Sequence, residues 1–434
     1  MSTSTNSAMV FPDYSHLPHV VIAGGGFAGI AAARGFIGKD VKVTIIDQHN
    51  FHTFLPLLYQ VATAALEPAE VAYPIRTIFG KEKNIGFRHG QILEVDHEAK
   101  NVRLNDGAVI GFDHLVIATG ATAAYFGIPG ASKFAMPLYS LSDSRKLRNT
   151  LLMTLESADV EAEEGKPVTR TFVVVGGGPT GVETSGAIAE LIRIVVRRDG
   201  LRIDPANIRV LLVDIAPRLL TPFPEKVSTY TAKKLTEMGI EIQFGRSVVE
   251  VQKDSIRFDD GEELEVAGVI WAAGVTANGT LASAVQESRG PSGRLRVGSD
   301  LRLADSNCVW AIGDSAAIHQ TDTTYLAQLA PVAIQSGRHV AKQILNVIGA
   351  QPTKPFKYHD KGIMATIGRH AAVAKLPTGQ VIKGTAGWLA WLGLHLWYLV
   401  GFRNRLRVMI NWTWRYFDWP SGPRLIVADA ETAD

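Results

Sequence analysis

A short apolar run that ends at a glycine-rich turn occurs twice along this chain. The first run is His19–Ala23 (HVVIA), which leads into residues 24–29 (GGGFAG) and then into the small-residue segment IAAARGF. The second run is 171–175 (TFVVV), which leads into 176–181 (GGGPTG) and then into a helical stretch at 182–196. Apolar runs of this length bounded by glycine are typical of buried strands. Both segments therefore predict a strand, a tight turn and a helix.

A second apolar run follows each predicted helix and ends in an aspartate. Residues 41–46 precede Asp47, and residues 210–213 precede Asp214. In a G-x-G-x-x-G turn, the first glycine permits the turn, the second lets the backbone approach a pyrophosphate, and the third lets helix and strand pack closely. An aspartate after the next strand accepts ribose hydroxyls and repels a 2′-phosphate. The pattern predicts two bound dinucleotides, FAD or NAD rather than NADP.

Three further apolar runs, at 115–118, 269–273 and 308–312, are each followed within two residues by a glycine. We expect each of the first two to close its own nucleotide-binding domain. The third run is followed by Asp314. An aspartate at such a strand end is a candidate ligand for the ribitol of a flavin.

The composition narrows the class of protein. Of the 434 residues, 46% are hydrophobic and 20% are charged, which excludes a largely disordered or fibrous chain. The 44 Lys and Arg nearly balance the 42 Asp and Glu, so the overall charge does not favour a nucleic-acid partner. The single cysteine, Cys308, excludes an intrachain disulfide, a C-x-x-C redox pair and a cysteine-rich metal site. We expect Cys308 to be a small core residue.

Neither a metal site nor a targeting peptide is expected from the sequence. The 12 histidines are scattered, and no catalytic triad or metal cluster is predicted. The first twenty residues contain no Lys or Arg before the first apolar run, which argues against a secretory signal or a transit peptide.

A long uncharged segment lies near the C-terminus. Residues 384–402 contain no Asp, Glu, Lys or Arg. A continuous helix there would rise ~28 Å, close to the ~30 Å of a bilayer core, so a membrane span is one alternative. The four glycines of the segment and the spread of Trp388, Trp391 and Trp397 along it argue against a span, because Trp prefers the headgroup level.

A basic amphipathic helix is predicted directly after this segment. Polar side chains recur every fourth residue, at Arg403, Arg407, Asn411 and Arg415. A neighbouring apolar stripe contains Leu406, Ile410, Trp414 and Phe417. Such a helix lies in the plane of a membrane surface, with its apolar side inserted and its arginines on anionic headgroups. A dimer-forming or core-packing helix is the alternative.

Together these features resemble the flavoproteins with two dinucleotide-binding domains, and within them the type II NADH dehydrogenases. The resemblance spans about residues 19–419 and rests on five segments: 47–63 (DQHNFHTFLPLLYQVAT), 176–190 (GGGPTGVETSGAIAE), 211–228 (LLVDIAPRLLTPFPEKVS), 329–341 (LAPVAIQSGRHVA) and 388–405 (WLAWLGLHLWYLVGFRNR). It implies an α/β fold with two Rossmann-like domains, in which the NAD domain is inserted into the FAD domain. The expected parts are 18–122 (FAD domain, first part), 123–298 (NADH domain), 299–383 (FAD domain, second part, with the quinone segment) and 384–434 (C-terminal membrane-associating helices).

The resemblance implies a non-proton-pumping NADH:quinone oxidoreductase. NADH would reduce a non-covalent FAD by hydride transfer to N5, and two electrons would then pass to a membrane quinone, either ubiquinone or menaquinone. The expected location is the cytoplasmic face of the bacterial inner membrane, as a peripheral protein, with a homodimer as a candidate assembly. Two alternatives remain: a soluble FAD-dependent reductase of a ferredoxin or rubredoxin, and a nucleotide-bound redox sensor or interaction protein.

The resemblance also implies the cofactor-binding residues. Those expected to hold FAD are Gly24, Gly26, Phe27, Ala28, Gly29, Asp47, Ala118, Thr119, Gly120 and Asp314. Those expected to hold NADH are Gly176, Gly178, Pro179, Thr180, Gly181, Asp214 and Gly274. Glu183 matches a catalytic acid that lies near the nicotinamide and the flavin in this family. Its alternative role is a first-turn acid that favours the helix dipole.

A quinone site is implied in the C-terminal third of the chain. The family motif AQxAxQ corresponds to residues 330–335, where Ala333 and Gln335 match and Pro331 replaces the first Gln. Proline has neither a side-chain hydrogen bond nor a backbone N–H to offer a quinone carbonyl, which leaves the binding mode open. Lys383 resembles a lysine beside the quinone, with an ordinary lysine at the start of an amphipathic segment as the alternative. Gln335 and Lys383 are therefore the expected catalytic partners of Glu183.

The cysteine count separates this family from its relatives. Glutathione-reductase-like, thioredoxin-reductase-like and sulfide:quinone reductases share the fold but need cysteine pairs beside the flavin, which a chain with one cysteine lacks. The sequence therefore predicts that electrons leave the flavin for an external acceptor.

Overall fold

Two compact units make up the protein. The computed structural model describes residues 14, 16–279, 281, 289–304, 306–417 and 424–427, with the backbone alone for 414–417. The first unit takes residues 1–52, 74–122 and 276–359, and the second takes 53–73, 123–275 and 360–434, each within the described ranges.

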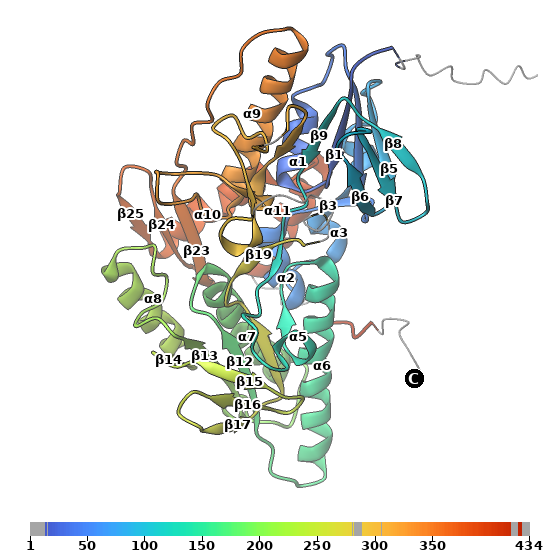
Figure 1. Ribbon diagram of the computed structural model, residues 1–434. Helices are drawn as coiled ribbons and strands as arrows, with labels where there is room; N and C mark the ends of the chain where they lie inside the picture. Colours follow the sequence, from blue (N-terminus) through green and yellow to red (C-terminus); the bar gives the residue numbers. More distant parts are fainter. Residues whose placement is uncertain are drawn as a thin grey trace, which may run out of the picture. The chain divides into compact units, whose positions relative to one another are not determined.

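A five-stranded parallel sheet lies at the centre of the first unit (Figure 1), with strand order β21-β9-β1-β2-β5. Its strands are β1 (His19–Ala23), β2 (Lys42–Asp47), β5 (Ile85–His89), β9 (His114–Ile117) and β21 (Val309–Ala311). Helix α1 (Phe27–Arg34) packs against α9 (Ala330–Ile348). A Cβ atom on Gly337 would lie 2.3 Å from the Ala28 carbonyl oxygen, so a glycine is required where these two helices meet.

The second unit repeats this architecture with the parallel sheet β11-β18-β12-β13-β14. Its strands are β11 (Met136–Pro137), β12 (Arg170–Val175), β13 (Ile208–Asp214), β14 (Ile240–Phe244) and β18 (Gly268–Trp271). Each unit also has an antiparallel three-stranded sheet, formed by β6 (Ile92–Asp96), β7 (Asn101–Leu104) and β8 (Val109–Gly111) or by β15 (Val248–Val251), β16 (Ser255–Phe258) and β17 (Glu263–Glu265). The predicted α/β fold with two Rossmann-like domains is confirmed.

The central strands form where the apolar runs predict them. Val20, Val21 and Ile22 of β1 have no exposed surface, as expected for parallel strands that are covered on both faces. The observed limits of β1, β2, β12 and β13 lie within two residues of the predicted ones. Helix α7 (Pro179–Arg198) begins three residues before the predicted start because Pro179, with its fixed φ, suits the first helical turn.

Additional elements of the second unit pack either on α7 or on its neighbour α2. They include α2 (Leu58–Ala62), α6 (Leu141–Glu163), α8 (Glu225–Glu237) and the antiparallel sheet β23-β24-β25 (Ile363–Gly368, Ala371–Lys375 and Val381–Lys383). Strand β23 packs closely on α7, since a Cβ atom on Gly186 would lie 2.1 Å from the Ile367 carbonyl oxygen. This close approach brings β23 beside the side chains of α7.

The uncharged C-terminal segment is not one continuous helix. Helix α10 (Gly384–Tyr398) ends at Leu399, whose backbone is extended, and α11 (Phe402–Phe417) follows. Among the residues that the structure describes, no helix is long and apolar enough to cross a membrane.

Helix α11 has one packed face and one exposed face. Asn404, Val408 and Trp412 are buried, while Leu406 and Ile410 of the predicted apolar stripe are exposed. Asn411 was expected beside the arginines at the surface, but it is partly buried and its side-chain amide donates to Glu70. The side chains of Trp414, Arg415 and Phe417 lie outside the described residues.

The remaining elements are short. They are β3 (Phe51–Thr53), η1 (Leu55–Leu57), α3 (Pro68–Val71), β4 (Ala72–Pro74), α4 (Ile75–Ile78), β10 (Ala121–Ala123), α5 (Ala131–Phe134), η2 (Pro205–Asn207), β19 (Val275–Ala277), η3 (Pro291–Gly293), β20 (Leu295–Arg296), η4 (Gly313–Ser315) and β22 (Ala316–Ala317). Cys308 directly precedes β21 rather than lying within a strand, and it is only partly buried.

The two units differ from the predicted domains at residues 53–73, 276–298 and 360–383. Residues from Thr276 onward belong to the first unit, where the Thr276 hydroxyl donates to the Ser292 carbonyl oxygen at 2.9 Å. Residues 360–383 belong to the second unit because they form the sheet that packs on α7.

Candidate functional site

Of the three glycines of the G-x-G-x-x-G pattern in the first turn, the fold requires the first and the third but not the second. Gly24 has φ +114°, and a Cβ atom there would lie 2.3 Å from the Ala118 carbonyl oxygen. A Cβ atom on Gly29 would lie 1.9 Å from the Gly24 carbonyl oxygen. At Gly26, in contrast, an added Cβ would meet no atom of the described residues within 4 Å. The space in front of Gly26 and the α1 N-terminus therefore suits a pyrophosphate group.

The second turn has the same design. Gly176 has φ +112°, and a Cβ atom there would lie 2.4 Å from the Ala272 carbonyl oxygen. A Cβ atom on Gly181 would lie 1.7 Å from the Gly176 carbonyl oxygen, whereas one on Gly178 would meet nothing in the described part of the chain within 4 Å. The residues present thus fit a second dinucleotide at the start of α7.

The two aspartates are fixed by equivalent backbone donors. Asp47 accepts from the N–H groups of Gly25 at 2.6 Å and His49 at 2.7 Å. Asp214 accepts from the N–H groups of Gly177 and, at 2.7 Å, Ala216. A carboxylate has about four acceptor positions, so each aspartate can still accept ribose hydroxyls.

A cavity of about 430 Å³, which includes space open to solvent, lies at the carboxyl ends of the central strands of the first unit. Gly24, Asp47 and Thr119, all predicted FAD ligands, line it together with Gln91 and Asn278. Ligands of doubly wound α/β sheets bind in such crevices. Gln91 and Asn278 lie outside the recognised motifs, and no sequence signal identified them.

Ser315 joins two predicted FAD segments. Its hydroxyl lies 3.1 Å from the Thr119 hydroxyl and accepts from the Gly120 N–H at 2.9 Å. The structure thereby brings Asp314 close to the end of β9. Burial raises the pKa of Asp314 to about 6, and nearby Arg294 opposes the rise. No motif predicted a contact of Ser315 with this segment, although Ser315 directly follows Asp314.

Glu183 lies beyond the first turn of α7, which contains no acidic residue, so the helix-dipole alternative loses support. Glu183 keeps some exposed surface as a residue, but its carboxyl is enclosed. Burial raises the pKa of this carboxyl to about 8, and the nearby donor groups of Thr366 and Trp391 oppose the rise. The Thr366 N–H donates to Glu183 Oε1 at 3.1 Å. The carboxyl can therefore hold a proton at neutral pH.

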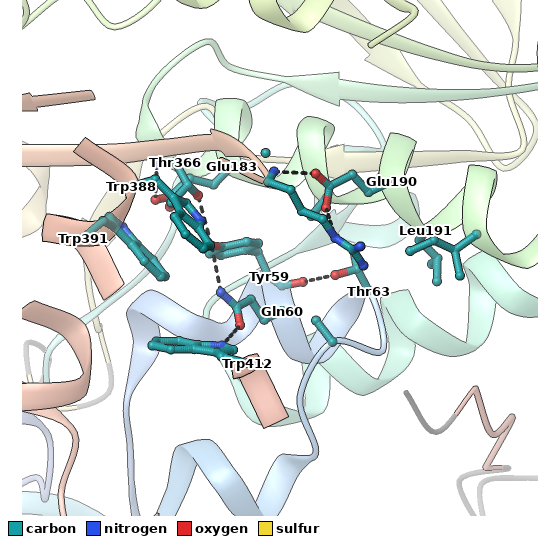
Figure 2. Close-up of a pocket in the computed structure, with 15 residues that line it drawn as sticks. Tyr59, Gln60, Thr63, Glu183, Glu190, Leu191, Thr366, Trp388, Trp391 and Trp412 are labelled. Atoms are coloured by element: carbon teal, nitrogen blue, oxygen red, sulfur yellow. Dashed lines mark hydrogen bonds and ion pairs between the residues drawn. The ribbon is translucent and has the colours of Figure 1, made fainter. Parts of the chain in front are cut away.

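Figure 2 shows the cavity beside Glu183, which measures about 640 Å³ including space open to solvent. Its walls come from α2, α7, β23, α10 and α11 of the second unit. The tryptophans on it are Trp388 and Trp391 of α10 and Trp412 of α11. Tyr59 and Gln60, from the segment 47–63 that carries the family resemblance, also line it. No role was predicted for these two side chains.

The predicted quinone residues of the first unit have local partners. The Gln335 side-chain amide donates to the His359 carbonyl oxygen at 2.9 Å and accepts from the His359 N–H at 3.0 Å. Pro331 lies in the first turn of α9, where its missing N–H leaves no helical hydrogen bond unmade. Gln328, which was not predicted, donates to the Asp314 carbonyl oxygen at 3.0 Å.

Lys383 belongs to the second unit, whereas Gln335 belongs to the first. Lys383 directly precedes α10 and is exposed. Its ammonium nitrogen lies 5.3 Å from the centre of the Tyr230 ring. Lys383 is not one of the described residues that line the cavity beside Glu183.

Exposed apolar side chains gather on α10 and α11. Trp397 and Phe402 are 73% and 81% exposed, and Leu389, Leu406 and Ile410 are also exposed. The predicted arginines Arg403 and Arg407 are exposed on α11. We call the exposed side chains Leu389, Trp397, Phe402, Leu406 and Ile410 the C-terminal apolar face.

Comparisons with known proteins agree with these features. Residues 18–337 match the family described as pyridine nucleotide-disulphide oxidoreductase, and residues 360–418 match the NDH2 C-terminal domain. The type II NADH:quinone oxidoreductase Ndh of Mycobacterium tuberculosis is 35% identical over 426 residues, which cover 95% of this chain and 90% of that protein. The internal alternative NAD(P)H-ubiquinone oxidoreductase A1, mitochondrial, of Arabidopsis thaliana is 31% identical over 91% of this chain and 83% of its own length.

A solved structure supports the fold. The structure of NDH2 from Plasmodium falciparum in complex with NADH has a TM-score of 0.84 and 21% sequence identity, and the match covers 94% of this chain and 99% of that one. The family matches and the curated relatives confirm the resemblance inferred from the sequence. This chain belongs to the pyridine nucleotide-disulphide oxidoreductase family and, within it, to the type II NADH:quinone oxidoreductases.

Proposed function

We propose that this protein oxidises NADH and reduces a membrane quinone, without pumping protons. The observation that carries the proposal is the duplicated nucleotide site, with free space at Gly26 and at Gly178 and an aspartate fixed beside each turn. A chain with two such sites and one cysteine is suited to pass electrons from one nucleotide cofactor through another to an outside acceptor.

The first unit is proposed to hold FAD and the second to hold NADH. Gly26 and the α1 N-terminus would receive the FAD pyrophosphate, Asp47 the adenosine ribose, and Asp314 the ribitol. For NADH, Gly178 would receive the pyrophosphate and Asp214 would bind the adenosine ribose. When bound, FAD supplies two-electron chemistry that links NADH oxidation to quinone reduction. The protein binds and orients the two nucleotides and excludes water.

Glu183 is proposed to supply a proton. The overall reaction is NADH + H⁺ + quinone → NAD⁺ + quinol, so one proton must come from outside NADH. With a pKa of about 8, Glu183 carries a proton at neutral pH. The adjoining cavity, which includes space open to solvent, gives this carboxyl a route to regain the proton. The quinone contacts of Pro331, Ala333, Gln335 and Lys383 stay predictions.

The C-terminal apolar face is proposed to lie on the membrane surface. Apolar side chains of α10 and α11 would insert between lipids, while Arg403 and Arg407 would contact anionic headgroups. Quinones reside in lipid, so an enzyme that reduces them gains from such contact. We place the protein on the cytoplasmic face of the bacterial inner membrane.

Turnover with different acceptors tests this proposal. The FAD-loaded protein should oxidise NADH faster with a quinone in anionic vesicles than with a ferredoxin or rubredoxin, and should prefer NADH to NADPH. One NADH should disappear for each quinone reduced. Faster reduction of the ferredoxin would instead favour the soluble reductase, which has no need of the C-terminal apolar face.

A further inference from the structure

A row of hydrogen bonds leads from helix α11 to Glu183 (Figure 2). The row contains Trp412 of α11, Gln60 and Tyr59 of α2, and Thr366 of β23, all in the second unit. We infer that these four are positioning residues, which present an oriented series of donors to Glu183 and so control how readily this carboxyl releases its proton. The inference rests on the proton-supplying role proposed above for Glu183.

The distances are those of ordinary hydrogen bonds. The Trp412 indole N–H donates to Gln60 Oε1 at 2.9 Å, and the Gln60 amide donates to the Tyr59 hydroxyl oxygen at 3.0 Å. The Tyr59 and Thr366 hydroxyl oxygens lie 3.0 Å apart. The Thr366 side chain also contacts the Glu183 carboxyl and lowers its pKa. The side-chain hydrogen bonds are continuous from Trp412 to Thr366. The Thr366 backbone N–H makes the connection to Glu183 Oε1 at 3.1 Å.

The donor at one end fixes the direction of the whole row. An indole N–H can only donate, so the oxygen of the Gln60 amide faces Trp412 and its NH₂ group faces Tyr59. The Tyr59 oxygen then accepts from Gln60, which leaves the Tyr59 hydrogen free to point to Thr366. Thr366 in turn can point its hydroxyl hydrogen to Glu183. Each donor polarises the next, and the last one stabilises the ionised carboxylate.

All four side chains of the row are buried, so none of them can exchange its hydrogen-bond partner for water. Tyr59, Gln60, Thr366 and Trp412 each have less than 9% of their surface exposed. A buried polar group that loses its partner is destabilising, so the four side chains are held to a common arrangement. The Trp391 indole N–H is buried near the same carboxyl but has no partner within hydrogen-bonding limits among the described residues. The donor that makes a hydrogen bond of ordinary geometry to this carboxyl is the Thr366 backbone N–H, at 3.1 Å from Glu183 Oε1.

Few charged groups lie near enough to Glu183 to change its pKa in place of the row. The titratable groups that face the cavity are Tyr59 on α2, Glu190 on α7 and Arg369 at the end of β23, with His395 of α10 behind Trp391. Arg369 and Glu190 pair at 3.7 Å. The pKa of His395 is lowered to about 4 by burial, so this imidazole is neutral. The pKa of Glu183 is set by burial and hydrogen bonds, which the row can change.

The pKa of Glu183 can be measured directly in the FAD-loaded protein without quinone. Infrared difference titration follows the C=O stretch of the protonated acid, which is assigned by its loss in Glu183→Gln. Thr366→Val should raise this pKa by roughly one unit, and Thr366→Ser should restore it. Tyr59→Phe should raise it by a smaller amount. Because the readout needs no turnover, its failure is distinct from failure of the NADH:quinone activity.

A double-mutant cycle shows whether Tyr59 and Thr366 act on the Glu183 pKa together, as members of one row, or independently of each other. Tyr59→Phe should cause no further rise in the Thr366→Val background, because the last donor is already gone. Trp412→Phe should act in the same direction as Tyr59→Phe, and Gln60→Met tests the same link if Trp412→Phe loses FAD. Tyr125→Phe, elsewhere in the second unit, is the control and should leave the Glu183 pKa unchanged. Additive shifts, or a shift with Thr366→Val but none with Tyr59→Phe, would overturn the inference.

Discussion

At the scale of residues, Asp214 is the side chain that we propose to set a preference for NADH over NADPH. Its carboxylate is fixed by the N–H groups of Gly177 and Ala216, at the place where an adenosine ribose is expected. Asp214→Ser removes the negative charge that repels a 2′-phosphate. We expect the ratio of kcat/KM for NADH to that for NADPH to fall by about tenfold or more, measured by steady-state oxidation of both nucleotides.

Asp47 offers a matched control because it occupies the same position in the first repeat. Asp47→Ser should weaken retention of FAD, seen as flavin lost on gel filtration. It should leave the NADH-to-NADPH ratio of the FAD-saturated protein unchanged. An unaltered ratio in Asp214→Ser would refute the assignment of that carboxylate to the ribose.

Glu183 leads to a pH prediction. Its pKa of about 8 means that the protonated form dominates at pH 7 and is lost as the pH rises through 8. If the carboxyl supplies the proton, quinone reduction should slow across that range. In Glu183→Gln the rate of quinone reduction should be lower by roughly 10² at pH 7, and the decrease in rate near pH 8 should vanish. The control Glu190→Gln, on the same helix, should still show the decrease in rate near pH 8.

Residues within local motifs could be predicted, but residues brought together by folding could not. The glycines and aspartates of both turns follow from spacing along a single strand–turn–helix unit. Thr366 and Glu183 are far apart in sequence, and their contact depends on the close packing of β23 on α7 at Gly186. No sequence pattern reveals that packing, so Tyr59, Gln60 and Thr366 received no role.

At the scale of elements, α11 makes the most direct prediction. Leu406 and Ile410 are exposed on the face opposite Trp412, so charges there should not disturb the packed face. The double change Leu406→Glu and Ile410→Glu should weaken binding to anionic vesicles by at least about tenfold, because two apolar side chains no longer enter the lipid. Vesicle flotation measures this binding.

Met153, which is exposed on α6, supplies the control. Met153→Glu should leave flotation unchanged. Binding of the α11 variant at the wild-type level, with FAD retained, would argue against membrane contact through the C-terminal apolar face.

The periodicity of the sequence identified the two faces of α11, but it did not indicate which face packs against the rest of the second unit. The sequence placed Asn411 with the arginines, whereas its amide donates to Glu70 within the second unit. An asparagine can serve either surface or interior, and only a buried partner on another element decides between them. The strands of the central sheets were easier to predict because both of their faces are covered.

At the scale of the whole molecule, the two units share more than the glycine-rich turns and aspartates that the motifs indicated. Both units combine a five-stranded parallel sheet with an antiparallel three-stranded sheet. The order of the segments predicted this plan, whereas the limits of the units did not follow from it. Residues 360–383 pack on α7, a contact between distant segments that composition does not show.

The central claim is that electrons pass from NADH through bound FAD to a quinone. Anaerobic stopped-flow spectroscopy of the flavin absorbance tests it most directly. The account predicts that NADH bleaches the flavin rapidly, that NADPH does so much more slowly, and that quinone in vesicles restores the oxidised spectrum faster than a ferredoxin does. Slow bleaching by NADH, or a bleached flavin that quinone does not reoxidise, would contradict it.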